Sequence, residues 1–398
     1  MGLLKKIILF LTVFCIMTVS VSALDSSDIS AECAVLISQQ TGEVIFKKNA
    51  YKHHSMASTT KIMTSLLAAQ SGKLHDEITV SKEMILVEGT SMGLLPGDSV
   101  SLYELIYGML LPSGNDAANV TAYYLGGNVE NFVKKMNAKA KEIGMENTNF
   151  VTPSGLDDEM HYSTAYDMAL LGRYAVGDPV FRSVCSSKKA SLSYGNPPYK
   201  RTLYNHNRLL ESYKYALGIK TGFTKKSGRC LVSYAEKDGT GLIAVTLNAP
   251  NDWNDHKLML DYGFSKLKRY VFKPVIPEHM DVVGGNVENL KISCEQFEYD
   301  SLEHRNVIQK LVIDKFAYAP IKKGDKLGWE DFAQYKSKDV GSGLYILLYD
   351  IDDGYSLAIG GVPDEKPMYM RLSYGTAFSD DCIDIRTGDV EAFIKTRK

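Results

Sequence analysis

The order of strand-like and helix-like segments is the feature that most restricts the fold of this 398-residue chain. Apolar runs and turn residues predict a β-hairpin over residues 34–46 and an antiparallel meander over residues 217–247. Between them, apolar residues recur at helical spacing. The helices expected there begin near Ser58 and cover residues 102–111, 116–125, 129–143 and 166–176, and one more is expected over residues 255–267. This order predicts a domain of the mixed α/β (α+β) class.

The two ends of the chain differ from this central part. Lys5 and Lys6 precede an almost wholly apolar run, and Ser22 and Ala23 then offer a cleavage site. Residues 1–23 therefore read as a secretory signal peptide, with a retained membrane anchor as the alternative, and the protein is expected outside the cytoplasmic membrane. Pro274 and Pro277 mark a second boundary. The expected organisation is a main domain over residues 24–268, a linker over 269–274, and a small β-rich domain over 275–398.

Composition and short motifs exclude several functional classes. The formal net charge of −2 shows no excess of basic residues, so a nucleic acid is not an expected partner. No HExxH or HxxE pattern is present, so neither a metal site nor a cofactor is expected. The five cysteines beyond residue 23 are widely spaced and odd in number, which favours isolated thiols over a disulfide framework, although one disulfide stays open.

The tetrapeptide Ser58-Thr59-Thr60-Lys61 stands at the start of the first expected helix. Ser58 and Lys61 are three positions apart and therefore share a face. A capping box would place Glu or Gln where Lys61 stands. The positive end of the helix dipole favours the neutral form of this amine, which a serine hydroxyl needs as a general base. Two other serine–lysine pairs have the same spacing, Ser186 with Lys189 and Ser265 with Lys268, but neither opens an apolar-faced helix so clearly.

Two further motifs follow along the chain. Ser113-Gly114-Asn115 is the only S-x-N sequence, and it lies in the loop between two expected helices. Lys220-Thr221-Gly222 ends a strand-like run, where a glycine allows close approach to the strand backbone. The order S-x-x-K, S-x-N and K-T-G, each in a fitting helix, loop or strand, indicates a serine nucleophile with a lysine base.

These three motifs resemble those of the penicillin-binding proteins and serine β-lactamases. The surrounding sequence is most similar to the D-alanyl-D-alanine carboxypeptidases, which are the low-molecular-weight penicillin-binding proteins. The matching stretches are residues 57–64, 113–118, 149–150, 154–157, 163–169 and 218–222, and residues 319–325 resemble the family's β-rich C-terminal domain more loosely. The resemblance implies a β-lactamase/transpeptidase-like domain with an antiparallel sheet flanked by helices, a helical subdomain, and a DD-peptidase activity.

The resemblance also implies the role of each site residue. Ser58 is the nucleophile, Lys61 its base, and Ser113 a proton relay to the leaving amine. The binding residues implied are Asn115 for the substrate amide, Lys220 and Thr221 for its carboxylate, and Gly222 beside them. Ser58 and Phe223 supply the backbone N–H groups of the oxyanion hole. Lys220 is expected to lower the pKa of Lys61 by like-charge repulsion. The partners implied are the peptidoglycan stem peptide and, as covalent inhibitors, β-lactam antibiotics.

Two departures from the family pattern are visible. Some relatives carry an arginine for the substrate carboxylate where this chain reads Leu247-Asn248-Ala249-Pro250, so carboxylate binding is expected to rest on Lys220, Thr221 and Thr224. Many relatives end in an amphipathic anchor helix, whereas residues 380–398 are mostly polar and charged, which leaves membrane attachment open.

Three alternatives to a carboxypeptidase stay open on the sequence. A DD-endopeptidase would use the same motifs. A class A β-lactamase would also need a glutamate for deacylation, and no E-x-x-L-N stretch follows Ser113. A non-catalytic wall-binding protein would be expected to have a degraded set of motifs.

Overall fold

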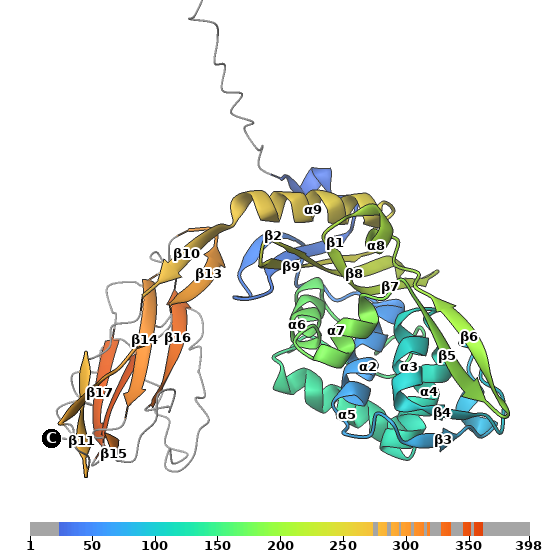
Figure 1. Ribbon diagram of the computed structural model, residues 1–398. Helices are drawn as coiled ribbons and strands as arrows, with labels where there is room; N and C mark the ends of the chain where they lie inside the picture. The colour runs from blue at the N-terminus through green and yellow to red at the C-terminus, as the bar shows by residue number, and fades with distance from the viewer. Residues whose placement is uncertain are drawn as a thin grey trace, which may run out of the picture. The chain divides into compact units, whose positions relative to one another are not determined.

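A computed structural model describes residues 24–273, 278–284, 288–293, 296–303, 306–313, 317–318, 328–335, 345–351 and 354–360. The chain divides into two compact units, residues 1–266 and residues 267–398. The first unit contains a sheet and most of the helices, and Figure 1 shows the sheet between α9 (Asp252–Lys266) on one side and the helices between residues 61 and 185 on the opposite side.

The five-stranded sheet of the first unit joins segments that are distant in sequence. Its order is β2-β1-β9-β8-β7, and all neighbours are antiparallel. The strands are β1 (Cys33–Ser38), β2 (Val44–Lys48), β7 (Ala216–Thr224), β8 (Gly228–Lys237) and β9 (Thr240–Leu247). Pairing of β1 with β9 unites the predicted hairpin with the predicted meander, so the helices between them form an insertion. The mixed fold with a helix-flanked antiparallel sheet is confirmed.

Two glycines show how closely helices cover both faces of this sheet. A Cβ atom at Gly263 of α9 (Asp252–Lys266) would lie 2.7 Å from Leu36 and 2.8 Å from Leu242. A Cβ atom at Gly172 of α6 (Ala165–Ala175) would lie 3.2 Å from Ile243. Because side chains alternate between the faces of a strand, Leu242 and Ile243 belong to opposite faces. The helices α9 and α6 therefore pack on opposite sides (Figure 1).

The helical region is built around α2 (Lys61–Ala69). The sequence indicates one apolar face for this helix, but eight of its nine residues are buried, and only Leu67 is partly exposed. A helix that is buried all round is a core helix. Its neighbours are α3 (Leu102–Leu110), α4 (Asn115–Gly126), α5 (Val129–Glu142), α6 and α7 (Pro179–Cys185). The helices predicted over 102–111, 116–125, 129–143 and 166–176 are thus confirmed to within two residues at each end.

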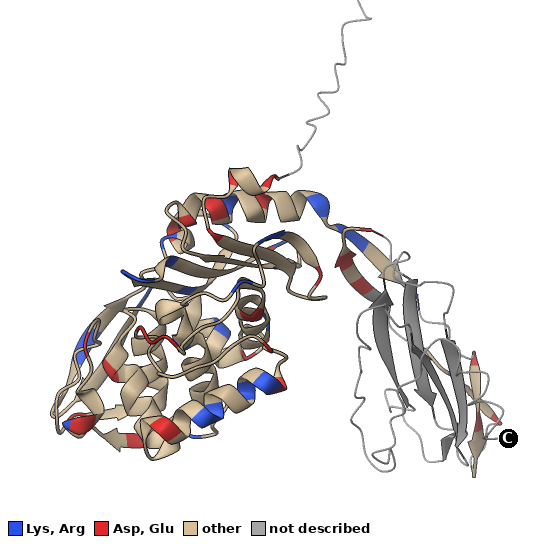
Figure 2. Cartoon of the chain, turned by 180° about the vertical axis from the view of Figure 1, so that it is seen from behind, with Lys and Arg blue, Asp and Glu red and all other residues tan. Residues whose placement is uncertain are grey.

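Several short elements complete the first unit. They are η2 (Ser26–Asp28), η3 (Ala57–Thr60), β3 (Glu77–Thr79), η4 (Glu83–Ile85), β4 (Ser99–Ser101), β5 (Lys189–Gly195), β6 (Pro198–Tyr204) and α8 (Leu209–Ser212). The β5–β6 hairpin and α7 are not among the elements expected from the sequence. Figure 2 shows Lys and Arg interspersed with Asp and Glu over this unit, without a continuous band of either sign in that view.

Every described element of the second unit is a strand. The strands are β10 (Lys268–Phe272), β11 (His279–Val283), β12 (Asn289–Lys291), β13 (Phe297–Ser301), β14 (Asn306–Ile313), β15 (Ala317–Tyr318), β16 (Gly328–Tyr335), β17 (Tyr345–Ile351) and β18 (Gly354–Gly360). The largest sheet has the order β16-β14-β18-β17, in which β17 and β18 are antiparallel. This unit is β-rich, as expected.

Some expectations fall outside the described residues. These are the signal peptide, the stretch 319–325, the polar C-terminal segment, and the cysteines Cys294 and Cys382. Cys33, Cys185 and Cys230 are buried free thiols. In the described part of the chain, no helix combines the length and apolarity that crossing a membrane requires.

Candidate active site

Ser58 lies in a tight turn that precedes α2 rather than in the α-helix itself. Of the four residues of η3, only Ser58 is not buried. The hydroxyls of Thr59 and Thr60 donate to the carbonyls of Met56 at 2.6 Å and Ala57 at 2.8 Å. His161, which is buried, contacts Thr60 Oγ1 through Nε2 at 2.8 Å. The turn is therefore fixed from within and leaves only Ser58 partly accessible.

Gly155 packs directly against this turn. Its φ is +85°, and a Cβ atom there would lie 1.9 Å from the carbonyl oxygen of Ala57. Ala57 itself has a positive φ of 47°. A glycine is required at position 155 for both conformation and space.

We expect Gly155→Ala to destabilise the protein more than Gly144→Ala. Gly144 has a φ of +84°, so both substitutions carry the same left-handed backbone cost. A Cβ atom added at Gly144 would have no contact within 4 Å among the described residues beyond its chain neighbours. Only the Gly155 variant also displaces the Ala57 carbonyl, which adds about 1–3 kcal/mol. Urea unfolding of the two variants measures this difference, and equal free energies of unfolding would contradict the close contact.

Lys61 is buried and is held by three contacts. Its Nζ lies 2.9 Å from Ser58 Oγ, 2.6 Å from Asn115 Oδ1 and 2.6 Å from the carbonyl oxygen of Ser154. The Asn115 Nδ2 group donates to the carbonyl of Glu88 at 2.6 Å, which fixes the orientation of this amide. Two of the three neighbours of Nζ can therefore only accept hydrogen bonds. A neutral amine has two N–H groups for them, and its lone pair then faces Ser58 Oγ.

The surroundings of Lys61 favour this neutral form. Burial lowers the pKa of Lys61 well below its usual value, the positive charge of Lys220 lowers it further, and Asp116 opposes both effects. The predicted repulsion by Lys220 is confirmed in direction. The helix dipole expected to favour the neutral amine is not the main cause, because desolvation of the amine is the largest effect.

The Ser113-Gly114-Asn115 segment forms the next side of the site. Ser113 has a positive φ of 66°, and its carbonyl accepts from Thr90 Oγ1 at 2.6 Å. In the part of the chain that the structure describes, its hydroxyl makes no hydrogen bond to Ser58 or Lys61. Asn115 is buried with both side-chain polar atoms engaged by Lys61 and Glu88. Asn115 therefore contacts the lysine.

The K-T-G segment lies on β7, which packs against η3. Lys220 is buried, and its Nζ donates to the carbonyl of Thr221 at 2.9 Å. Burial lowers the pKa of Lys220 to about 7. A Cβ atom at Gly222 would lie 3.1 Å from the backbone nitrogen of Ser58, so this glycine lets β7 approach the serine closely. Phe223 is 67% exposed.

One cavity of about 520 Å³ connects these segments. Its lining includes Ser58, Ser113, Thr221, Gly222 and Phe223, whereas Lys61, Asn115 and Lys220 lie behind the surface. Further lining residues, none of which belongs to the three motifs, are Thr90, His206, Arg208, Arg229, Asp252 and Trp253. The cavity can admit an extended peptide end to Ser58, with the Lys61 amine buried behind the serine.

Thr224 is occupied by protein groups. Its Oγ1 donates to Asp157 Oδ1 at 2.8 Å and contacts Ser227 Oγ at 2.7 Å. It does not line the cavity.

Comparison with known proteins agrees with this geometry. Residues 17–251 match the family described as D-alanyl-D-alanine carboxypeptidase. The chain is 36% identical over 317 residues to D-alanyl-D-alanine carboxypeptidase DacF of Bacillus subtilis, which covers 75% of this chain and 80% of the relative. It is 30% identical over 385 residues to D-alanyl-D-alanine carboxypeptidase DacC of Escherichia coli, which covers 89% and 92% of the two chains.

Solved structures give the same result for the first unit. The Streptomyces K15 DD-transpeptidase is 31% identical, with a TM-score of 0.57, over 60% of this chain and 98% of that chain. A D-alanyl-D-alanine carboxypeptidase from Mycobacterium tuberculosis is 30% identical, with a TM-score of 0.58, over 62% and 95%. A buried lysine contacts an accessible serine, and the family match and the relatives agree with this site. The chain therefore belongs to the D-alanyl-D-alanine carboxypeptidase family of serine peptidases.

Proposed function

We propose that this chain is a serine-type D-alanyl-D-alanine carboxypeptidase that removes the terminal D-alanine of peptidoglycan stem peptides. The observation that carries the proposal is the contact between Lys61 Nζ and Ser58 Oγ at 2.9 Å, with the other neighbours of Nζ restricted to acceptors. That arrangement supports proton transfer from the serine to the lysine.

The acylation step begins at Ser58. Its Oγ attacks the carbonyl carbon of the penultimate D-alanine, and Lys61 Nζ takes the hydroxyl proton. A C–O bond forms, and the carbonyl oxygen becomes an oxyanion. The backbone N–H groups of Ser58 and Phe223 are the donors proposed for it, and such a donor is worth roughly 2.7–4 kcal/mol. The approach of Gly222 to the Ser58 nitrogen supports this placement.

Collapse of the intermediate breaks the C–N bond. The proton then passes from Lys61 to the leaving amine of the terminal D-alanine, with Ser113 as the relay. Ser113 lines the same cavity as Ser58, which supports this role. Lys61 is then neutral again, and its Nζ takes a proton from the water that attacks the ester carbonyl. The bond between the carbonyl carbon and Ser58 Oγ breaks, and Lys61 returns the proton to Oγ, which restores the serine hydroxyl.

We assign Asn115 to positioning of Lys61. The resemblance implies contact of Asn115 with the substrate amide, but its Oδ1 accepts from Lys61 and its Nδ2 donates to Glu88. Lys220 acts on Lys61 through its charge, and the Thr221 hydroxyl is proposed to bind the substrate carboxylate. By the same chemistry, β-lactams acylate Ser58. Action outside the cytoplasmic membrane is proposed from the signal-like residues 1–23.

Digestion of purified muropeptides tests the proposal. The expected products are free D-alanine and tetrapeptides from pentapeptides, with cross-linked dimers left intact. Conversion of dimers to monomers without release from pentapeptides would identify a DD-endopeptidase, and D-alanine exchange without net hydrolysis would identify a transpeptidase. Either result would contradict the assignment.

A further inference from the structure

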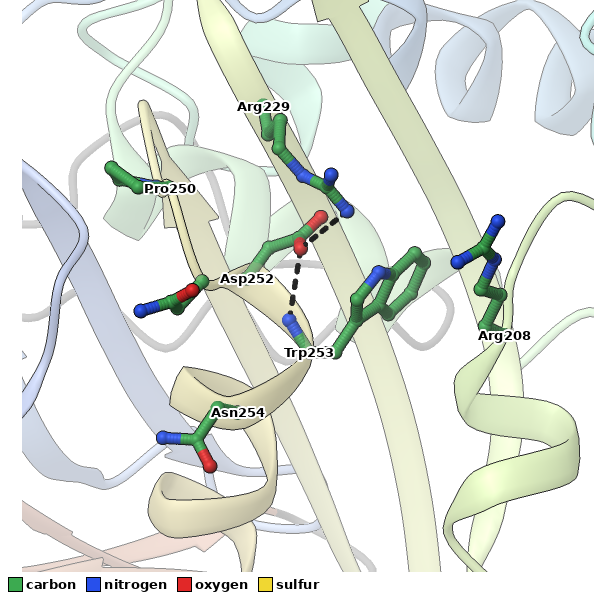
Figure 3. A pocket seen from close by; sticks show the side chains of 7 residues that line it. Arg208, Arg229, Pro250, Asp252, Trp253 and Asn254 are labelled. Carbon is green, nitrogen blue, oxygen red and sulfur yellow. Dashed lines mark hydrogen bonds and ion pairs between the residues drawn. The ribbon is translucent and has the colours of Figure 1, made fainter.

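Beyond the three motifs, the cavity has a basic wall that the mechanism above does not use. Arg229 on β8 and Arg208 beside α8 both line the cavity that contains Ser58 and Thr221. Arg229 pairs in register with Phe223 of β7, the residue next to Gly222. The two guanidinium groups also line an adjoining hollow of about 310 Å³ at the start of α9. Figure 3 shows the Trp253 indole between them.

The two arginines differ in how they are held. Arg229 Nη2 lies 2.7 Å from Asp252 Oδ1, and its guanidinium carbon lies 5.7 Å from the Trp253 ring centre. Asp252 also accepts from the Trp253 backbone N–H at 2.9 Å (Figure 3). Asp252 thus orients the Arg229 guanidinium through Nη2 alone. The Nε atom of Arg229 is buried and has no hydrogen-bond partner among the described residues. The guanidinium of Arg208 has no hydrogen bond or ion pair within the described part of the chain.

The charges that line the cavity favour an anion. Asp252 balances one of the two arginines, which leaves a net positive charge at this wall. An arginine stays protonated in proteins and can bind a carboxylate through two parallel N–H···O hydrogen bonds. Lys220 is a weaker candidate, because burial lowers its pKa to about 7 and its amine already donates to Thr221. Thr224 is engaged by Asp157 and Ser227.

We propose that Arg229, with Arg208 beside it, forms the subsite for the free carboxylate of the substrate's leaving residue. This inference rests on the proposed function and corrects the expectation that carboxylate binding depends on Lys220, Thr221 and Thr224 alone. Asp252 and Trp253 hold Arg229 in place, and Thr221 supplies a hydroxyl on the β7 side. The arrangement makes the enzyme select peptides with an ionised C-terminus over capped ones.

Two matched peptides test the subsite: a diacetyl-lysyl-D-alanyl-D-alanine with a free carboxylate, and the same peptide with a C-terminal amide. We expect the wild-type protein to prefer the free acid in kcat/KM. Arg229→Gln is expected to lower this preference at least about tenfold, the worth of a charge-assisted hydrogen bond. Arg229→Lys retains the charge without the two-pronged geometry and is expected to restore part of the preference.

Arg182→Gln is the control. Arg182 is paired with Glu236 at 2.6 Å, and its side chain is 45% exposed, against 43% for Arg229. It lies outside the cavity lining, so the preference is expected to stay unchanged. Because Arg229→Gln also leaves Asp252 without its ion-pair partner, Arg208→Gln is the second variant; it breaks no described contact and is expected to reduce the preference in the same direction.

The outcomes separate this inference from the proposed function. Hydrolysis of the acid and the amide at equal rates by the wild-type protein would overturn the subsite while leaving the carboxypeptidase assignment intact. An unchanged preference in both Arg229→Gln and Arg208→Gln would overturn it as well. Absence of hydrolysis of either peptide by the wild-type protein would count against the proposed function itself.

Discussion

Ser58→Ala is expected to abolish covalent labelling by a fluorescent penicillin while the protein remains folded. Removal of Oγ eliminates the atom that forms the ester, and no other serine in the described residues combines access to the cavity with contact to a buried amine. Loss of a nucleophile in a serine hydrolase lowers kcat by about 10⁴-fold or more. The measurement is labelling intensity after denaturing electrophoresis, with circular dichroism as the check on folding.

Ser186→Ala provides the matched control. Ser186 and Lys189 repeat the S-x-x-K spacing, but Ser186 follows α7 and its hydroxyl donates to the carbonyl of Ser183. We expect this variant to label like the wild-type protein. Labelling that persists in Ser58→Ala would place the nucleophile elsewhere.

Lys61→Met is expected to slow acylation by about 10²–10⁴-fold, the usual contribution of a general base. Methionine fills a similar volume without a proton acceptor. It leaves Asn115 Oδ1 and the Ser154 carbonyl without their donor, so the free energy of unfolding must be measured alongside the rate. The rate itself is obtained from the time course of labelling at saturating penicillin.

Lys189→Met is the control for this substitution, because it removes the lysine of the second S-x-x-K pair. Its acylation rate is expected to equal that of the wild-type protein. An acylation rate within a few-fold of wild type in folded Lys61→Met would exclude Lys61 as the base.

Local patterns in the sequence are enough to predict much of the fold. Apolar spacing and turn residues identify the hairpin, the meander and most of the helices around α2. The short helix α7 is missed although Asp178 caps it and Pro179 occupies its first position, a combination typical of a helix start. The β5–β6 hairpin is missed because β5 is mostly exposed or partly exposed, so no apolar face marks it.

The site is predictable to the extent that it depends on short motifs. The three motifs contain four residues that line one cavity, Ser58, Ser113, Thr221 and Gly222, and the lysine that contacts Ser58. The main cause of the low pKa of Lys61 could not be predicted, because burial of the amine depends on Asn115 and Ser154, which distant segments supply. Arg229 could not be recognised for a similar reason. Its surroundings exist only where β8 meets the start of α9, which brings Asp252 and Trp253 beside it.

The proposed chemistry depends on Lys61 having a pKa well below that of a free lysine, so that its neutral amine is available as the base. Nuclear magnetic resonance of protein labelled with ¹³C at the lysine side chains measures this directly, with Lys61→Met to assign the resonance. We expect the chemical shift of Lys61 to report a pKa well below the ordinary lysine value of 10.5. If the Lys61 amine stays protonated up to about pH 10, the proposed role is contradicted, because the serine would then have no base beside it.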